Sequence, residues 1–443
     1  MKVFKFGGAS VKDAPSVRNM AQIIKANLNQ PLVVIVSAMG KTTNAFERLL
    51  DATMQEEDPT EALAAITSFH EQIIYDLGLS SNEELQADIE NIYEELENAL
   101  NKFSSTMGYD YVYDQSVSCG ELLSTKIIAA YLAKEGITNT WLDARKVLKT
   151  DNTHRQAKVD WGASQAMIRS QVNPMLESGI VISQGFIGSN AKFNTTTLGR
   201  EGSDFTGAIF ATSLNAASLT IWKDVPGVLN ADPKKFEKTT LYKQLPYKEA
   251  AEMTYYGASV IHPKTIKPLA QKGIPLYVKS FETPEAEGTI IEECQVPNLA
   301  PAIIHKDKQT VISFKISDFS FINEHHIHMI FDHVKRLNLS INLMQNSAIT
   351  FTICMDDDPK RREQLRTALM EEFSIYYNEG LEMITVKNYN QATIDELMID
   401  KQIIIEQRSR NNFQMVYKKL WRTRWRSKKV QPLDLLSQLM FLH

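Results

Sequence analysis

The chain has 443 residues, too many for one ordinary hydrophobic core, so we expect two or three domains. With 43% hydrophobic and 23% charged residues, the composition is that of a folded globular protein, which excludes a disordered or fibrous one. The formal net charge of −5 gives the whole protein no attraction to nucleic acid or to an anionic membrane. Function must therefore reside in local sites.

Three cysteines lie far apart, at Cys119, Cys294 and Cys354. Their odd number and wide spacing, without a CxxC motif or a nearby histidine cluster, argue against a disulfide framework or a zinc site. No apolar run has the length needed to cross a bilayer, and the glycine turn at residues 7–8 comes too early for a signal-peptide core. These features predict a cytoplasmic protein without a metal site of its own or a membrane partner.

Short apolar runs alternate with longer stretches of helical period. The predicted strands are residues 3–6, 32–37, 140–142, 180–183, 219–222 and 275–279. Apolar residues between the first two strands recur every three or four positions, which predicts a crossover helix. These residues are Val17, Met20, Ile24 and Leu28. A later helix is predicted over residues 81–103, with Ser81 and Glu84 as a capping box. Such alternation indicates a mostly parallel α/β sheet.

The pattern changes near residue 295, where two prolines occur and the periodicity stops. We therefore predict a first domain at residues 1–295 and a second region at residues 296–443. Shorter strand and helix units are predicted over residues 310–373, and an abbreviated second copy over residues 381–417. Residues 418–429 form a basic extension with seven Lys or Arg and no acidic residue. We interpret this extension as solvated or packed in a dimer.

A glycine pair follows the first predicted strand, with a lysine just before it. Gly7 and Gly8 have no Cβ, so their backbone N–H groups can approach an anion, and a helix start close behind adds a favourable dipole. Lys5 supplies a positive charge for a phosphoryl group, although the spacing is not that of a P-loop. The alternative interpretation is a plain tight turn.

Hydroxyl side chains follow the second predicted strand, at the sheet edge where open α/β proteins bind ligands. Ser37 and Thr43 stand in this segment. They are candidates for holding a substrate, and helix capping is the alternative.

The densest group of glycine and polar residues covers residues 195–206 and follows a glycine-flanked segment at residues 184–188. Arg200 offers a planar fork that grips a carboxylate with two hydrogen bonds, and Asp204 could orient a lysine. The alternative is an ordinary loop in which Ser203 or Asp204 caps the next helix.

A strand followed by a turn-rich loop covers residues 222–234 and contains Lys223, Asp224 and Lys234. Lysines beside backbone turns suit a nucleotide. The Pro-Gly and Asp-Pro pairs in the same loop are equally good plain turn formers.

Five segments resemble, in order and spacing, the aspartate kinases of the amino-acid kinase fold. These segments are residues 5–10, 116–124, 184–188, 196–206 and 225–233, and they span nearly all of residues 1–295. The region after residue 295 resembles tandem ACT domains, which are small βαββαβ modules. The resemblance implies an α/β amino-acid kinase fold, a mostly parallel sheet between helical layers, followed by α+β ACT-like regulatory domains.

The resemblance further implies that ATP, with Mg²⁺, phosphorylates the β-carboxylate of L-aspartate to 4-phospho-L-aspartate, the first step of lysine, threonine and methionine biosynthesis. Lys5 and Asp204 take the implied catalytic roles. The implied substrate-binding residues are Ser37, Thr43, Glu121, Phe186, Arg200 and Ser203. The implied nucleotide-binding residues are Lys5, Gly7, Gly8, Lys223, Asp224, Leu229, Lys234 and Ser259.

Two implied roles concern the substrate's charged groups: Glu121 receives its α-ammonium group, and Arg200 clamps a carboxylate. Without the resemblance, Glu121 is predicted to be an exposed carboxylate in the first turn of a helix. Because the β-carboxylate is already ionised at neutral pH, no strong general base is needed, and catalysis depends on positioning and charge.

The ACT-like region implies an amino-acid effector, lysine or threonine, and at least a homodimer. Asn342 and Ala348 stand where lysine-sensing relatives tend to carry acidic residues, so the effector stays open. Acetylglutamate kinase, glutamate 5-kinase and UMP kinase share the fold, but none combines this arginine loop with an ACT-like tail. A non-catalytic amino-acid sensor is the alternative from another class, and the intact phosphoryl-transfer lysine argues against it.

Overall fold

The structure, a computed structural model, describes residues 1–101, 108–258, 261–316 and 320–420. It divides into two compact units, Met1–Ile304 and His305–His443. The division falls beyond residue 295 because the next residues still pack on the first unit: Ala302 and Ile304 belong to its hydrophobic core. The predicted basic extension lies almost wholly outside the described residues.

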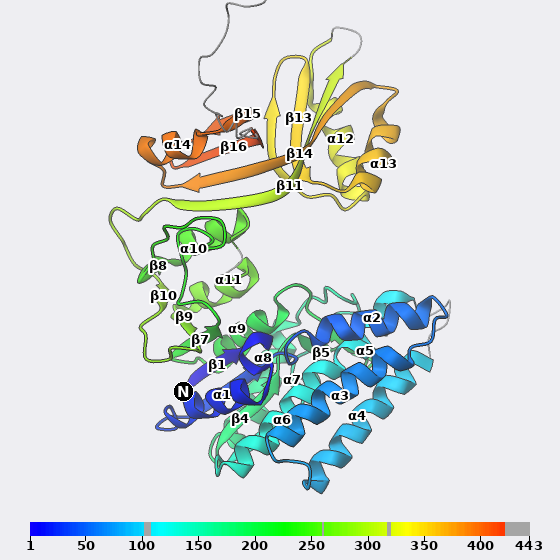
Figure 1. Ribbon diagram of the computed structural model, residues 1–443, viewed down its shortest axis with the longest axis vertical. Coiled ribbons are helices and arrows are strands. Elements are labelled where there is room, and N and C mark those ends of the chain that lie inside the picture. The colour runs from blue at the N-terminus through cyan, green and yellow to red at the C-terminus, as the bar shows by residue number, and fades with distance from the viewer. Residues whose placement is uncertain (102–107, 259–260, 317–319, 421–443) are drawn as a thin grey trace, which may run out of the picture. The chain divides into compact units, whose positions relative to one another are not determined.

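An eight-stranded sheet forms the centre of the first unit (Figure 1). Its spatial order is β3 (Asn139–Leu142), β4 (Ile180–Gln184), β2 (Leu32–Val36), β1 (Lys2–Phe6), β7 (Ser218–Lys223), β9 (Leu276–Ser280), β10 (Thr289–Glu292) and β8 (Gln244–Pro246). Neighbouring strands are parallel except β9 and β10. Every strand predicted in this part was found, which confirms the mostly parallel sheet. Parallel strands bring their carboxyl ends to one edge.

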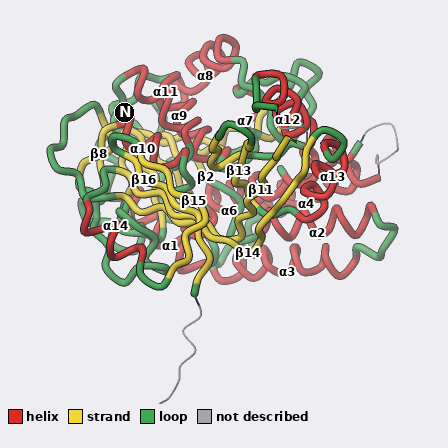
Figure 2. Tube along the Cα trace, turned by 90° about the horizontal axis from the view of Figure 1, so that it is seen from above, coloured by secondary structure: helices red, strands yellow, loops and turns green. Residues whose placement is uncertain are grey.

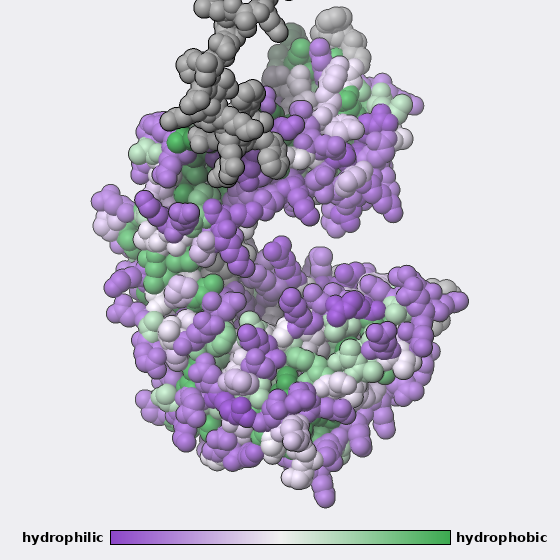
Figure 3. Space-filling view, in the orientation of Figure 1, coloured by the Kyte–Doolittle hydropathy of each residue, from purple (hydrophilic) through white to green (hydrophobic). Residues whose placement is uncertain are grey.

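Helices cover both faces of this sheet. One face packs against α1 (Ala14–Lys25), α3 (Thr60–Asp76), α4 (Glu83–Asn101) and α6 (Cys119–Lys134). The other packs against α7 (Ala144–Val147), α8 (Trp161–Met175), α9 (Gly202–Ser213), α10 (Tyr247–Tyr255) and α11 (Pro263–Lys272). A third apolar cluster holds α2 (Thr42–Met54) and α5 (Tyr109–Val117) against α4 and α6. On the face drawn in Figure 3, hydrophilic residues cover most of these outer helices.

Three smaller elements complete the first unit, namely the 3₁₀ turn η1 (Gly8–Val11) and the hairpin of β5 (Ile187–Ser189) with β6 (Thr195–Thr197). Two local predictions were wrong. Helix α1 ends at Lys25, so Leu28 lies outside it and is 43% exposed. Helix α4 begins at Glu83, and the side chain of Asn82, not Ser81, accepts the capping hydrogen bond from the Leu85 N–H.

The second unit contains a six-stranded sheet. Its order is β12 (Ile341–Asn346), β13 (Thr350–Asp356), β11 (Ala302–Ile316), β14 (Phe373–Lys387), β16 (Asn412–Lys419) and β15 (Lys401–Arg408). Its helices are α12 (Glu324–Arg336), α13 (Pro359–Leu369) and α14 (Gln391–Met398). The predicted full copy and abbreviated copy are both present, and Figure 2 shows the strands of the two copies as one continuous sheet.

Strand β14 belongs to both copies: it is the last strand of the first and the first strand of the second. Besides the shared β14, the described part of the second copy has two strands, β15 and β16, and one helix, α14. His305, near the start of β11, bonds Glu382 in the later half of β14, with Nε2 and Oε2 2.6 Å apart. The start of β11 therefore lies beside β14 where a fourth strand of the second copy would belong. Among the described residues, no helix is long and apolar enough to cross a membrane.

Candidate active site

Two lysines and one aspartate meet at the carboxyl ends of β1 and β7. The Nζ of Lys5 lies 2.7 Å from Oδ1 of Asp204, and the Nζ of Lys223 lies 3.3 Å from Oδ2. Lys5 is 7% exposed and Asp204 3%. Burial alone would raise the pKa of Asp204, but the two ammonium groups outweigh it and lower that pKa below its ordinary value. Two cations and one anion leave this cluster with net positive charge, which suits a phosphate.

The loop after β1 packs directly on the loop after β2. A Cβ on Gly8 would stand 2.7 Å from the carbonyl oxygen of Gly40 and 2.8 Å from that of Ala38. The Gly40 N–H also donates to the Gly8 carbonyl oxygen. Only glycine fits at position 8, because neither backbone oxygen can move cheaply. The close packing joins the predicted phosphate cradle to the loop that follows Ser37.

Glu121 lies in the first turn of α6 and is only 2% exposed, so the prediction of an exposed carboxylate was wrong. Its Oε2 has no hydrogen-bond partner among the described residues. Burial raises the pKa of Glu121 to about 8, against the opposing effects of the Ala38 backbone N–H and Lys5. Ser124, one turn further along α6, donates to the Ser37 carbonyl oxygen. The buried, unpaired Oε2 of Glu121 is thus placed to accept a cation.

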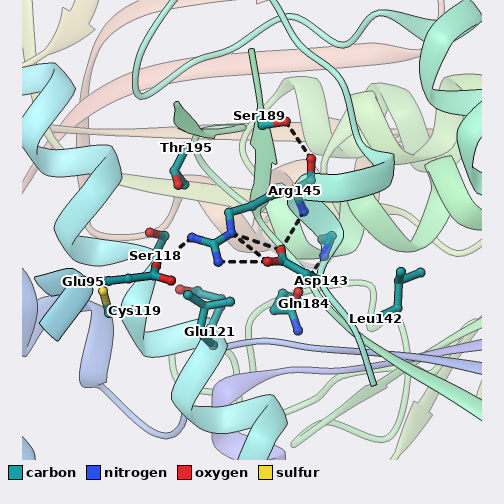
Figure 4. Close-up of polar contacts among 12 residues, drawn as sticks. Glu95, Ser118, Cys119, Glu121, Leu142, Asp143, Arg145, Gln184, Ser189 and Thr195 are labelled. Atoms are coloured by element: carbon teal, nitrogen blue, oxygen red, sulfur yellow. Dashed lines mark hydrogen bonds and ion pairs between the residues drawn. The ribbon is translucent and has the colours of Figure 1, made fainter. Parts of the chain in front are cut away.

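A polar network holds α6 beside the ends of β3 and β4 (Figure 4). Gln184, the last residue of β4, donates from Nε2 to the Thr125 hydroxyl of α6 at 2.8 Å. Arg145 pairs with Asp143 and with Glu95 of α4, at 2.8 and 2.9 Å. Figure 4 shows Glu121 beside this group. These supporting residues were not assigned from sequence patterns, because they come from four separate elements.

The segment from β4 to α9 contains two residues with backbone strain. Phe186 has φ of 73° and Glu201 has φ of 54°, a region that favours glycine. The Phe186 N–H donates to the hydroxyl of Thr206 in α9. A Cβ on Gly185 would lie 2.5 Å from the Cβ of Ser203, so this turn lies against the start of α9. The turn that carries Phe186 and the start of α9 at Ser203 are thus brought together.

Glu201 was not assigned from the sequence. Its Oε2 is buried and has no hydrogen-bond partner among the described residues. Burial raises its pKa, and the charges of Lys223, Asp204, Arg200 and Lys5 also act on it. Arg200 is exposed, yet it and Lys5 both influence this one carboxylate. The amino-terminal lysine and the arginine loop therefore converge on one region.

The capping alternatives were wrong. The N-cap of α9 is Glu201, and no side chain caps this helix, so neither Ser203 nor Asp204 has that role. Helix α2 begins after Lys41, again without a side-chain cap, so Thr43 does not cap it either. Thr43 is half-buried in the first turn of α2.

Three other predicted nucleotide residues follow Lys223 along the chain. Asp224, Leu229 and Lys234 belong to the loop between β7 and β8, where Leu229 bridges to Leu241. Asp224 and Lys234 are exposed. No described contact joins these three residues to Lys5 or Asp204. Ser259 lies outside the described residues.

Sequence reasoning also missed a buried carboxylate behind the arginine loop. Asp114 of α5 is fully buried and accepts from the Thr197 hydroxyl at 2.6 Å and from the Arg155 backbone N–H. The Nδ1 of His154 lies 2.7 Å from its other oxygen. Burial raises the pKa of Asp114, against these contacts. Asp114 therefore fixes β6, which ends three residues before Arg200. An aspartate between Tyr113 and Gln115 gives no sequence signal for this role.

The amino acid kinase family matches residues 1–280 of the chain. That match covers more than half of the chain and includes every residue of the candidate active site described above. The chain therefore belongs to the amino acid kinase family.

The more similar relatives are aspartokinases. Lysine-sensitive aspartokinase 3 of Escherichia coli (strain K12) is 33% identical over 361 residues, which cover 80% of this chain and 78% of that protein. The chloroplastic bifunctional aspartokinase/homoserine dehydrogenase 2 of Arabidopsis thaliana is 34% identical over 303 residues, or 67% of this chain but only 32% of that longer protein. The chain is thus an aspartokinase-type member of the family.

Solved structures agree over nearly the whole chain. E. coli aspartokinase III in complex with aspartate and ADP (R-state) has a TM-score of 0.80 and 27% identity, covering 94% of this chain and 96% of that one. The same enzyme in complex with lysine and aspartate (T-state) has a TM-score of 0.78 and 28% identity, covering 94% and 95%. The kinase fold followed by ACT-like domains is confirmed.

Proposed function

We propose that this protein transfers the γ-phosphoryl group of ATP to the β-carboxylate of L-aspartate and forms 4-phospho-L-aspartate. One observation carries the proposal. The buried cluster of Lys5, Asp204 and Lys223 lies at the same sheet edge as the unpaired carboxylate oxygen of Glu121. A phosphate site and a site for an ammonium group thus lie side by side.

Charge and positioning supply the catalysis in this mechanism. The aspartate β-carboxylate is already a nucleophile at neutral pH, so no residue has to remove a proton from it. It is repelled by the phosphates, and Lys5 with the backbone N–H groups near Gly7 and Gly8 offsets that repulsion. Asp204 holds the Lys5 ammonium group in place. Asp224, Leu229, Lys234 and Ser259 are proposed to contact the rest of the nucleotide.

Glu121 and Arg200 are proposed to hold the amino-acid end of the substrate. The α-ammonium group bonds the unpaired Oε2 of Glu121, and Arg200 grips a carboxylate with its planar fork. Because the pKa of Glu121 is about 8 in the unliganded protein, binding of the ammonium group releases a proton near neutral pH. Ser37, Thr43, Phe186 and Ser203 complete the substrate pocket in this proposal.

The donor atoms present fit Mg²⁺, which prefers carboxylate oxygens together with substrate phosphates. Glu201 offers a buried Oε2 without a partner among the described residues. Both oxygens of Asp204 already face ammonium groups. Glu201 is therefore the residue proposed to hold the ion, which when bound neutralises charge on the transferred phosphoryl group.

Regulation and assembly are proposed for the second unit. An amino-acid effector, lysine or threonine, is expected at the ACT-like region, and pairing of these units would give a homodimer. Asn342 is already engaged, because its side chain accepts from Lys306 and donates to Gln309 and Asp356. This neutral side chain offers an incoming lysine ammonium group no charge of its own.

An acyl-phosphate trapping assay tests the proposal. The purified protein, given MgATP, hydroxylamine and aspartate, should form aspartyl hydroxamate, and should give little product with glutamate or acetylglutamate. Preference for another acceptor would overturn the substrate assignment. Binding of aspartate without any turnover would indicate a sensor instead. Repeating the assay with lysine, threonine or methionine identifies the effector.

A further inference from the structure

A groove of about 600 Å³ lies over α9, between α8 and α11. Figure 2 shows these three helices side by side. At one end Trp161 of α8 meets Phe205 of α9 edge to face, with ring centroids 5.9 Å apart. At the other end Arg169 donates to the Ser213 carbonyl oxygen. Helices α8 and α9 therefore run in the same direction, and the groove follows them.

The groove has an apolar, aromatic wall. The Trp161 side chain is 42% exposed, which is unusual for a large aromatic ring outside an interface. Phe205 is half-buried beside it, and Pro268 of α11 is buried opposite. Two amide side chains, Gln165 and Gln271, also line the groove. Such a wall accepts a flat ring and offers hydrogen bonds to its edge.

The charges along the groove are of one sign. Lys264, Lys267 and Lys272 of α11 line it, and helices α8 and α11 contain no Asp or Glu. Helix α9 has one acidic residue, Asp204, which faces Lys5 and Lys223. Beyond these helices, Asp160 is the N-cap of α8 and accepts from the Ala163 N–H. This basic strip stands out in a chain whose net charge is −5.

We propose that this groove is a second binding site, for a small anion that carries an aromatic ring, of the nucleoside monophosphate class. The ring packs on Trp161 and Phe205, while the phosphate binds the exposed ammonium groups of Lys264 and Lys267. The site is separate from the phosphate cluster at Lys5. Because Phe205 follows Asp204 directly, the ligand contacts α9 one residue away from the catalytic carboxylate.

The test follows Trp161 in the full chain. The sequence has five tryptophans, so the ¹⁵N-labelled protein gives at most five indole N–H signals, and Trp161→Phe identifies the one that belongs to Trp161. Titration with AMP should shift this signal to saturation. Adenosine supplies the ring alone and pyrophosphate the charge alone, so each should bind about tenfold more weakly, which corresponds to about 1.4 kcal/mol.

Two charge-reversal variants distinguish AMP binding in this groove from nonspecific binding elsewhere on the surface. Lys267→Glu should weaken AMP binding at least about tenfold. Lys248→Glu is the matched control, an exposed lysine on α10 outside the groove, and should leave AMP binding unchanged. Both variants should keep the turnover of the unaltered protein.

Lys5→Ala excludes the candidate active site as the source of the signal. The Trp161 shift should persist in this variant, and its loss there would overturn the proposal. The proposal also fails if AMP gives no saturable shift up to about 10 mM, a very weak affinity. If pyrophosphate shifts the Trp161 signal as strongly as AMP does, the groove is a nonspecific anion surface, and the proposed packing of the ring on Trp161 and Phe205 is rejected. These readouts do not depend on the identity of the phosphoryl acceptor.

Discussion

Lys5 on the first strand and Asp204 on α9, 199 positions apart in the chain, are joined by an ion pair of 2.7 Å that water hardly reaches. Because Lys223 approaches the other carboxylate oxygen, the aspartate holds two ammonium groups at fixed positions. Preorganised charge of this kind can stabilise a transition state without reorganisation at the moment of reaction.

Lys5→Ala should lower kcat by about 10²–10³-fold, because it removes a charge aimed at the phosphoryl group. The hydroxamate assay measures the loss, and circular dichroism checks that the variant is folded. Lys2→Ala on the same strand is the control, since Lys2 lies at the opposite end of β1. Turnover retained by Lys5→Ala would refute the assigned role.

Aspartate binding should depend on pH through Glu121. Since its pKa is about 8, this carboxyl group is mostly protonated near pH 6 in the unliganded protein and ionises as the pH rises to 8. The KM for aspartate should therefore fall over this interval. Glu121→Gln should raise KM and remove this part of the pH dependence. A KM that is independent of pH in the unaltered protein would contradict the proposed role.

The same group should affect stability in the opposite direction. The folded protein holds the proton with a pKa of about 8, against 4.5 for the unperturbed group, so stability falls as the pH rises from 4.5 through 8. Without substrate, Glu121→Gln should have a higher Tm than the unaltered protein at pH 8, and the difference should vanish near pH 4.5. Thermal scans at several pH values measure it. A lower Tm for the variant at pH 8 would argue against the raised pKa.

Gly8→Ala should destabilise the protein by about 1–3 kcal/mol and reduce activity, because its methyl group meets two backbone oxygens. Urea unfolding and the hydroxamate assay measure both effects. Gly162→Ala on α8 is the contrasting variant, since its added Cβ has nothing closer than 3.6 Å. That change should stabilise the protein by about 0.5–1 kcal/mol. Equal effects of the two substitutions would contradict the close packing at position 8.

Asp114→Ala should lower the free energy of unfolding by about 2–4 kcal/mol, since it leaves buried donors without an acceptor. It should also raise KM for aspartate, because β6 and the arginine loop lose their anchor. Asp110→Ala is the control, on the same helix: its pair with Arg155 is exposed, and such pairs contribute at most about 1 kcal/mol. A loss of stability with KM unchanged would limit Asp114 to a structural role.

Local sequence patterns were sufficient to predict the strands of the first unit. A short apolar run that lies between glycines or helical stretches rarely forms anything other than a buried strand. The roles proposed for Lys5 and Gly8 also rest on a local pattern, since a lysine and glycines at a strand end suit a phosphate. The burial of Glu121 was not predictable from its position in a helix, because it depends on the loop after β2. Asp114 and Glu201 were missed because their surroundings come from distant segments.

Strand β14 belongs to both ACT-like copies, and the first half of β11 lies beside it in the place of a fourth strand of the abbreviated copy. Neither copy therefore has a separate sheet, because the strands of one copy continue into those of the other. We expect the regulatory unit to melt in a single cooperative step, and a chain cut at Gly380 to lose both modules together.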